Sequence, residues 1–140
     1  MYNFTTPAAM FAELCLDRVD TVVAGSVFVG TMPEEPNECI VFYDTGGEEQ
    51  NDRIAIDKYK VQIRARGSYA ETYTLLQDVK RQLQSIPRFT LNDGTVVVGI
   101  WARSNTAFMG RDDQERAMFS INFKLKTTPA DIGHRNFSAN

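Results

Sequence analysis

The chain has 140 residues, 43% of them hydrophobic, and a formal net charge of −3. A chain of this length folds as one domain and needs no disulfide or metal to support its core. Cys15 and Cys39 lie far apart in apolar runs, which favours free, packed thiols in a reducing compartment. No apolar run reaches the roughly 18 residues of a membrane span, so we expect a soluble, cytosolic single domain over residues 1–140.

Charge is distributed unevenly along the chain. The segment from Glu34 to Asp57 contains eight acidic residues and one basic residue, Arg53. From Lys58 onward, thirteen basic residues stand against seven acidic ones. Separated charges of opposite sign suit a self-complementary protein, in which the acidic segment of one copy meets a basic face of the next. A solvated acidic loop on an ordinary mixed surface is the alternative that this pattern leaves open.

The first third of the chain predicts a helix and two strands. Thr6 and Pro7 form a helix start, and apolar residues follow at helical spacing, which predicts a helix over residues 7–18. A β-branched run predicts a strand that begins near Ser26. The unbroken apolar centre of residues 38–44 predicts a strand that is buried on both faces. The connection from Thr45 to Asp57 contains two glycines and a run of charges, which predicts a mobile segment.

The stretch from Lys58 to Leu83 predicts a strand, a turn and a helix. Apolar and polar residues alternate from Tyr59 to Arg66, so one face of the strand is buried and the other is cationic. Ser68 and Glu71 have the spacing of a capping box, which starts a helix at Tyr69. The predicted buried stripe of this helix is Tyr69, Tyr73, Leu76, Val79 and Leu83.

The remaining segments predict further strands. Residues 89–91 give a short extended piece, 95–103 a strand, 104–115 a long loop, and 116–126 a strand with alternating apolar residues. The tail after Pro129 has little pattern and is predicted to be flexible. This order predicts an α+β fold: a mainly antiparallel sheet of four to five strands, with two helices packed on one face. If the alternating strands share their polar side, Lys124 and Lys126 join the cationic face.

Two kinds of chemistry have candidate residues in the sequence, nucleophilic catalysis and the binding of a divalent cation. The only histidine, His134, lies in the unpatterned tail, which argues against nucleophilic catalysis. Asp112, Asp113 and Glu115, with Asp44 or Asp57, have the carboxylates of a divalent-cation site. The favoured interpretation is a turn whose acids cap the next strand or pair with Arg111 and Arg116. We therefore expect no catalytic residue, no bound metal and no cofactor.

A nucleic-acid-binding module is a further interpretation of the cationic strand face. Tyr59, Tyr69 and Phe89 accompany the basic residues, but these aromatics fall on the apolar sides of their elements. The acidic overall balance also opposes attraction to phosphate. Direct nucleic-acid binding is therefore the less favoured interpretation, and a small enzyme ranks below it.

Several segments, taken in order, resemble the tail terminator and minor capsid proteins of long-tailed bacteriophages. They are Met32-Pro33 with Pro36-Asn37-Glu38-Cys39-Ile40, Tyr43-Asp44-Thr45-Gly46-Gly47, Val61-Gln62-Ile63-Arg64-Ala65-Arg66, Ser68-Tyr69-Ala70-Glu71, and Gly110-Arg111-Asp112-Asp113 leading to Phe119-Ser120-Ile121-Asn122-Phe123. The resemblance covers Met32 to Thr127 and is weaker over residues 1–30. It implies a structural virion protein without catalytic residues, assembled in the bacterial cytoplasm and located in the tail or neck.

The resemblance also implies a mode of action. A homo-oligomeric ring, usually a hexamer, would end tail-tube polymerisation at the head-proximal end and join the tail to the head connector. Its partners would be the tail tube protein and the connector protein, and DNA would pass through without tight binding. A head-tail connector protein of the same particle is the alternative. The expected subunit-interface residues are Lys58, Lys60, Arg64, Arg66, Glu48, Glu49, Asp52, Arg111, Asp112, Asp113 and Arg116.

Overall fold

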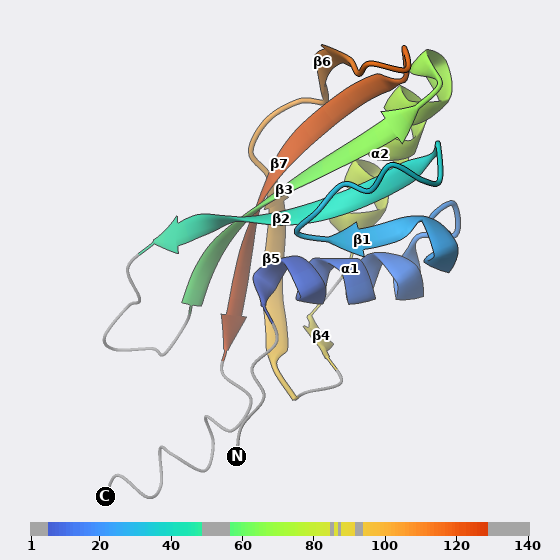
Figure 1. The fold of residues 1–140 in the computed structure, drawn as a ribbon. Helices are drawn as coiled ribbons and strands as arrows, with labels where there is room; N and C mark the ends of the chain where they lie inside the picture. The colour runs from blue at the N-terminus through green and yellow to red at the C-terminus, as the bar shows by residue number, and fades with distance from the viewer. Residues whose placement is uncertain (1–5, 49–56, 85, 87, 92–93, 129–140) are drawn as a thin grey trace, which may run out of the picture.

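The computed structural model describes residues 6–48, 57–84, 86, 88–91 and 94–128, which form an α+β fold (Figure 1). The helices are α1 (Pro7–Arg18), the short 3-10 helix η1 (Ala24–Ser26) and α2 (Tyr69–Gln84). The strands are β1 (Val27–Val29), β2 (Cys39–Glu48), β3 (Asp57–Gly67), β4 (Phe89–Thr90), β5 (Val96–Ala102), β6 (Ala107–Arg111) and β7 (Ala117–Thr128). The predicted flexible tail, residues 129–140, lies outside the described residues, as does His134.

The strands form one sheet in the order β1-β2-β3-β7-β5-β4, and β6 also pairs with β7. Every pair is antiparallel except β1 with β2, which is parallel. The α+β class, the two helices and the mainly antiparallel pairing are thus confirmed. The predicted count of four to five strands is wrong, because the described residues contain seven. The segments predicted near Ser26 and at residues 89–91 are the short strands β1 and β4, whereas β6 lies in a segment predicted to be a loop.

β5 and β6 behave as one interrupted strand along one side of β7. Ala102 pairs with Phe123 and Ala107 pairs with Ser120, so the two strands follow each other along the same side of β7. The break at residues 103–106 is bridged by Ser104, whose Oγ accepts from the backbone N–H of Asn122 at 3.0 Å. The prediction of a loop over residues 104–115 is therefore wrong for residues 107–111. A register shift between Phe108 and Gly110 interrupts the period-two pattern there.

The core lies between the inward face of the sheet and both helices. β3 and β7 pair Val61 with Phe123 and Ile63 with Ile121, and all four side chains are buried. Phe11 of α1 packs on Phe123 with ring centroids 5.4 Å apart. From α2, Leu76, Val79 and Leu83 complete the same core cluster. Both helices thus pack on the apolar face of the sheet, as predicted.

The buried stripe of α2 is shifted by comparison with the prediction. Thr72 is buried with Leu76, whereas Tyr69 and Tyr73 remain 52% and 42% exposed. The observed buried row also has helical spacing, so it fits the apolar face of the sheet as well as the predicted row would. It consists of Thr72, Leu76, Val79 and Leu83. The two tyrosines consequently lie on the flank of α2 that faces β6, where each ring packs on Phe119 of β7.

The predicted threonine cap of α1 is confirmed, whereas the start of α2 differs from the predicted capping box. Thr6 Oγ1 accepts from the Ala9 N–H at 3.2 Å, and Asp44 Oδ1 accepts from the Ala8 N–H at 2.9 Å, so α1 has two oxygen partners at its first turn. At α2, Ser68 Oγ donates to Glu71 Oε1, and the Ser68 carbonyl accepts from the Thr72 N–H. In the capping box predicted for α2, the Ser68 and Glu71 side chains would each accept a hydrogen bond from a backbone N–H of the other residue. In the structure the two side chains bond to each other instead.

β2 is longer than predicted. Residues 45–48 continue the strand past a register shift between Asp44 and Gly47, and Glu48 pairs with Lys58. The predicted connection of residues 45–57 therefore narrows to residues 49–56. Those residues, with Glu49 and Asp52 among them, lie outside the described part of the chain. Within β2, Cys39 and Phe42 show the predicted burial on opposite faces.

Candidate assembly surfaces

The outward side of β3 and β7 carries a block of lysines. Register places Lys58 opposite Lys126 and Lys60 opposite Lys124, and all four side chains are partly exposed. Like charges directly opposite each other on neighbouring strands destabilise a sheet unless an anionic group lies nearby. Together with Arg64 on the same side, these residues are called the lysine face. Its predicted composition is confirmed except at Arg66.

Two aromatic side chains flank the lysine face. Trp101 of β5 lies beside the lysines, with Lys126 Nζ 5.0 Å from the centre of its ring. The Arg64 guanidinium lies over Tyr43 at 4.8 Å, and its Nε donates to Gln62 Oε1 at 2.6 Å. These contacts hold the cationic groups against the sheet with their charge still accessible from one side.

Arg66 does not project into solvent, contrary to the prediction that it belongs to the exposed cationic face. Its side chain is buried, with 5% of the residue exposed. Its guanidinium donates to the Pro36 carbonyl at 2.7 Å and to the Glu34 and Asn37 carbonyls at 3.3 Å each. Its role within the subunit is to hold the loop of residues 30–38 against the end of β3.

Arg116 and Asp112 support the same loop from the turn between β6 and β7. Asp112 accepts from both the backbone N–H and the Nε of Arg116, at 2.9 and 2.8 Å. Arg116 Nη1 then donates to the Glu34 carbonyl at 2.7 Å and to Asn37 Oδ1 at 3.1 Å. Desolvation acts to raise the pKa of Asp112, but the hydrogen bonds from Arg116 and the Gln114 amide outweigh it and lower the pKa.

This network confirms the predicted structural interpretation of the acidic turn. Asp112 pairs with Arg116, while Arg111 Nη1 donates to the Glu115 carbonyl at 2.9 Å. Asp44 caps α1 instead of joining the turn. In the part of the chain that the structure describes, no group of three or more His, Cys, Asp or Glu residues is placed to hold a metal ion.

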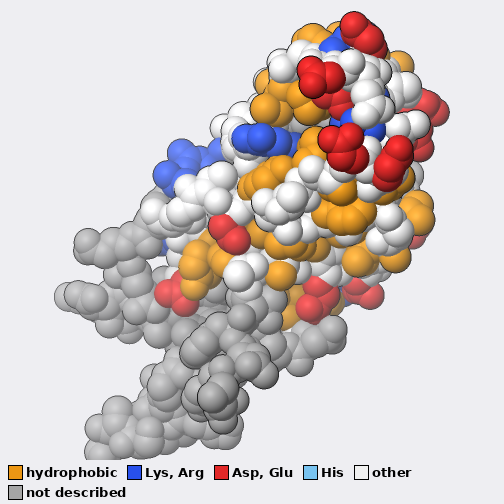
Figure 2. Space-filling view, viewed as in Figure 1, with side chains coloured by type: hydrophobic (Ala, Val, Ile, Leu, Met, Phe, Trp, Pro, Cys, Tyr) orange, Lys and Arg blue, Asp and Glu red, His pale blue; other side chains and the backbone are white. Residues whose placement is uncertain are grey.

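Exposed acidic side chains gather at the end of the sheet where this network lies. They come from the loop of residues 30–38, the start of α2 and the β6–β7 turn: Glu34, Glu35, Glu38, Glu71, Asp113 and Glu115. We call this region the acidic end. Figure 2 shows acidic side chains concentrated at the upper right of the molecule and basic ones farther to the left. The lysine face and the acidic end therefore occupy different parts of the surface, although Arg111 and Arg116 lie within the acidic end.

An exposed aromatic patch lies where α2 meets β6. It consists of Tyr69, Tyr73, Phe108 and Met109, each at least 40% exposed. The Phe108 ring lies 5.4 Å from Tyr69 and 5.2 Å from the buried Phe119, measured between centroids. Sequence reasoning missed this patch, because it placed the tyrosines in the buried stripe and Phe108 in a loop. The one available signal was the adjacent pair Phe108 and Met109 in an otherwise polar segment.

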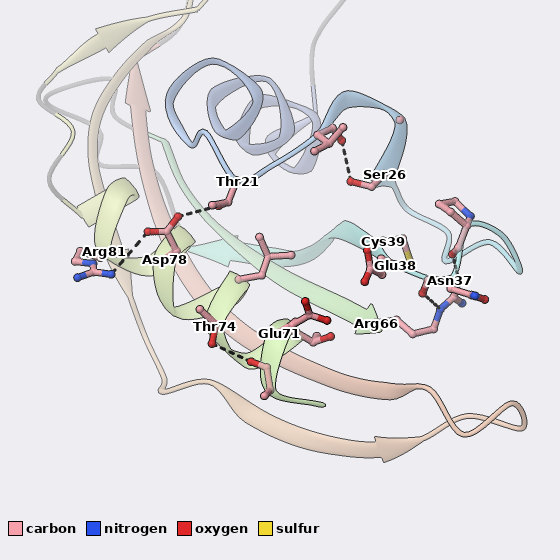
Figure 3. A pocket seen from close by; sticks show the side chains of 16 residues that line it. Thr21, Ser26, Asn37, Glu38, Cys39, Arg66, Glu71, Thr74, Asp78 and Arg81 are labelled. Carbon is pink, nitrogen blue, oxygen red and sulfur yellow. Dashed lines mark hydrogen bonds and ion pairs between the residues drawn. The ribbon is translucent and has the colours of Figure 1, made fainter. Parts of the chain in front are cut away.

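A groove of about 1150 Å³ runs along the other flank of α2 (Figure 3). The segment from Thr21 to Ser26 forms one wall, α2 forms the other, and the end of the 30–38 loop closes one side. Asp78 Oδ2 accepts from the Thr21 hydroxyl at 2.8 Å across the groove, and Asp78 also pairs with Arg81 at 3.8 Å. Val23, 63% exposed, and Leu75 contribute apolar surface, and Glu38 and Glu71 contribute carboxylates.

The two thiols do not form a nucleophilic centre. Cys15 is buried in the core, and burial raises its pKa. Burial also raises the pKa of Cys39, although the charges of Arg66 and Arg116 act in the opposite direction. Both groups are therefore held as neutral thiols near pH 7.

Comparison with known proteins identifies the family. The helices among the described residues are too short or too polar to cross a membrane. A search of curated proteins gives no match. The family model described as bacteriophage tail terminator protein matches residues 12–129, which include α2 and all seven strands. The chain therefore belongs to the family of bacteriophage tail terminator proteins.

Proposed function

We propose that this protein forms a ring at the head-proximal end of the phage tail tube, where it ends tube polymerisation and joins the tail to the head connector. The observation that carries the proposal is the family match over residues 12–129. The protein acts through its surfaces and catalyses no reaction. In the virion its partners are further copies of itself, the tail tube protein and the connector protein, and DNA passes without tight binding.

The separated charges support a ring of subunits. A closed ring requires a head-to-tail contact between two different patches of the same subunit. The lysine face and the acidic end are two such patches, and they have opposite charge. We assign Lys58, Lys60 and Arg64 to one side of the contact and Asp113 to the other, with Arg111 beside it. The contact repeats six times in the proposed hexamer.

Three of the expected interface residues have a supporting role in this proposal. Arg66, Arg116 and Asp112 position the loop that carries Glu34, Glu35 and Glu38. Their loss would weaken assembly by displacing the acidic end. Glu48 is opposite Lys58 in the sheet register, so its backbone lies at the edge of the lysine face.

Tube assembly with and without the protein tests the proposal. Purified tail tube protein is polymerised on its initiating complex, and tube ends are imaged by electron microscopy. We expect rings at one end of each tube and an arrest of growth when the protein is present. Uncapped tubes that keep growing would refute the proposal, and rings found only on head portals would identify a connector protein instead.

The lysine face gives one specific reason to test nucleic-acid binding as a second function. A binding module would retain the isolated protein on DNA with an affinity that falls steeply as salt rises. Lys60→Gln would weaken such retention. For a tail terminator we expect no salt-sensitive retention at physiological ionic strength, and filter binding with duplex and single-stranded DNA distinguishes the two functions.

A further inference from the structure

We propose that the aromatic patch of one subunit docks into the α2 groove of the next subunit and forms the apolar centre of the head-to-tail contact. The inference rests on the proposed ring, and it names the surfaces that hold the ring together. Neither surface was expected from the charge pattern of the sequence.

The aromatic patch has the composition of a binding surface. Tyr69, Tyr73 and Phe108 are joined by ring contacts with one another or with Phe119, and each remains substantially exposed. Met109, the next residue of β6 after Phe108, is also exposed. Aromatic and methionine side chains are enriched at the centres of protein interfaces, where their burial dominates the binding free energy. A contiguous exposed patch of this kind on a small domain marks a site that another surface covers.

The α2 groove offers a receiving surface on the opposite flank of the same helix. Tyr69 and Tyr73 line the flank toward β6, whereas Ala70, Leu75 and Asp78 line the flank toward Thr21. The patch of a subunit therefore cannot reach its own groove, because α2 itself lies between them. A second copy presents the missing surface, and repetition of this contact adds subunits in one direction only.

Charges at the margins of the two surfaces are complementary. Arg111 lies over the Tyr69 ring at 5.9 Å, and Lys80, on the same flank of α2, contacts Asn105. Glu38 and Glu71 line the groove and are exposed, whereas the two arginines of the groove are engaged within the subunit, Arg81 with Asp78 and the buried Arg66 with loop carbonyls. An apolar centre with oppositely charged margins matches the usual anatomy of a specific interface. The lysine face and the remaining acidic-end residues, Glu34, Glu35, Asp113 and Glu115, are not among the groove residues and add long-range attraction.

Cysteine cross-linking tests the contact and its direction. Met109→Cys places a thiol on the patch and Val23→Cys places one at the groove, while the native thiols are buried. A flexible bis-maleimide is added to free protein and to protein bound at tube ends, and products are separated on denaturing gels. We expect each single variant to remain monomeric, the mixture to give a dimer, and the double variant to give a ladder that ends at the ring size.

The matched control pairs Met109→Cys with Leu16→Cys, since Leu16 is exposed on α1 outside the groove. The inference would be overturned if the yield of cross-linked product from the double variant were no higher than the yield from this control pair. Self-linkage of a single variant would also overturn it, because it would show a symmetric contact. Failure of the proposed function gives a different result: tubes remain uncapped by the wild-type protein, whether or not the ladder forms.

Discussion

Arg66 lies at a position that the alternation of β3 predicts to be exposed, yet its side chain stabilises the fold from a buried position. It donates to three carbonyls of the 30–38 loop from a buried position. We predict that Arg66→Met lowers the free energy of unfolding by about 2–3 kcal/mol, because three partly buried hydrogen bonds from a charged donor are lost. Urea denaturation measures the change, with Lys60→Met on the same strand as the control. Equal unfolding midpoints for the two variants would contradict the assigned role.

Asp112 gives the turn between β6 and β7 a pH-dependent stability. Its pKa is lowered in the folded state, so its stabilising contribution is present above the usual aspartate pKa of about 4 and is lost as pH falls through the lower folded value. We predict that the stability difference between wild type and Asp112→Asn is constant near neutral pH and shrinks in acid. Thermal unfolding across this range measures it, with Asp113→Asn as the control for charge. A difference that persists in acid would show that the substitution acts through packing.

Among the secondary-structure elements, the long periodic segments and the short strands β1 and β4 were predictable from sequence, whereas β6 was not. The bounds of α1 and the start of α2 follow from local capping chemistry, and β3 and β7 follow from strict alternation. β6 was missed because a bulge interrupts its pattern. The lysine face was predictable since the register of two alternating strands determines it. The aromatic patch and the groove depend on the rotation of α2 over the sheet, which tertiary packing decides.

The bulge in β2 depends on Gly47. A Cβ at this position would lie 2.5 Å from the backbone oxygen of Lys58, so any larger residue forces β2 and β3 apart. We predict that Gly47→Ala destabilises the protein by roughly 1–3 kcal/mol, because backbone must shift. Gly25→Ala is the matched control, since a Cβ there has no neighbour within 4 Å. Differential scanning calorimetry of both variants provides the comparison, and equal transition temperatures would mean that β2 accommodates the methyl group.

For the molecule as a whole, the charged and the apolar surfaces make different contributions to assembly. Attraction between the lysine face and the acidic end acts over distance and is screened by salt. Burial of the aromatic patch in the α2 groove acts only on contact and is much less sensitive to salt. The two contributions can therefore be separated by the ionic strength at which capping of tail tubes is measured.

We predict opposite behaviour for two variants when the protein concentration that caps half of the tubes is measured from low to high salt. Lys60→Gln weakens capping at low salt and flattens its salt dependence, because part of the screened attraction is removed. Phe108→Ser raises the required concentration by roughly tenfold or more at every salt concentration, because it removes an aromatic anchor from the contact. Arg88→Gln, which removes one exposed cationic charge outside both surfaces, is the control and should follow the wild type. If Lys60→Gln and Arg88→Gln behave alike, charge at the lysine face has no specific role in capping. If Phe108→Ser caps tubes as the wild type does, the aromatic patch lies outside the subunit contact.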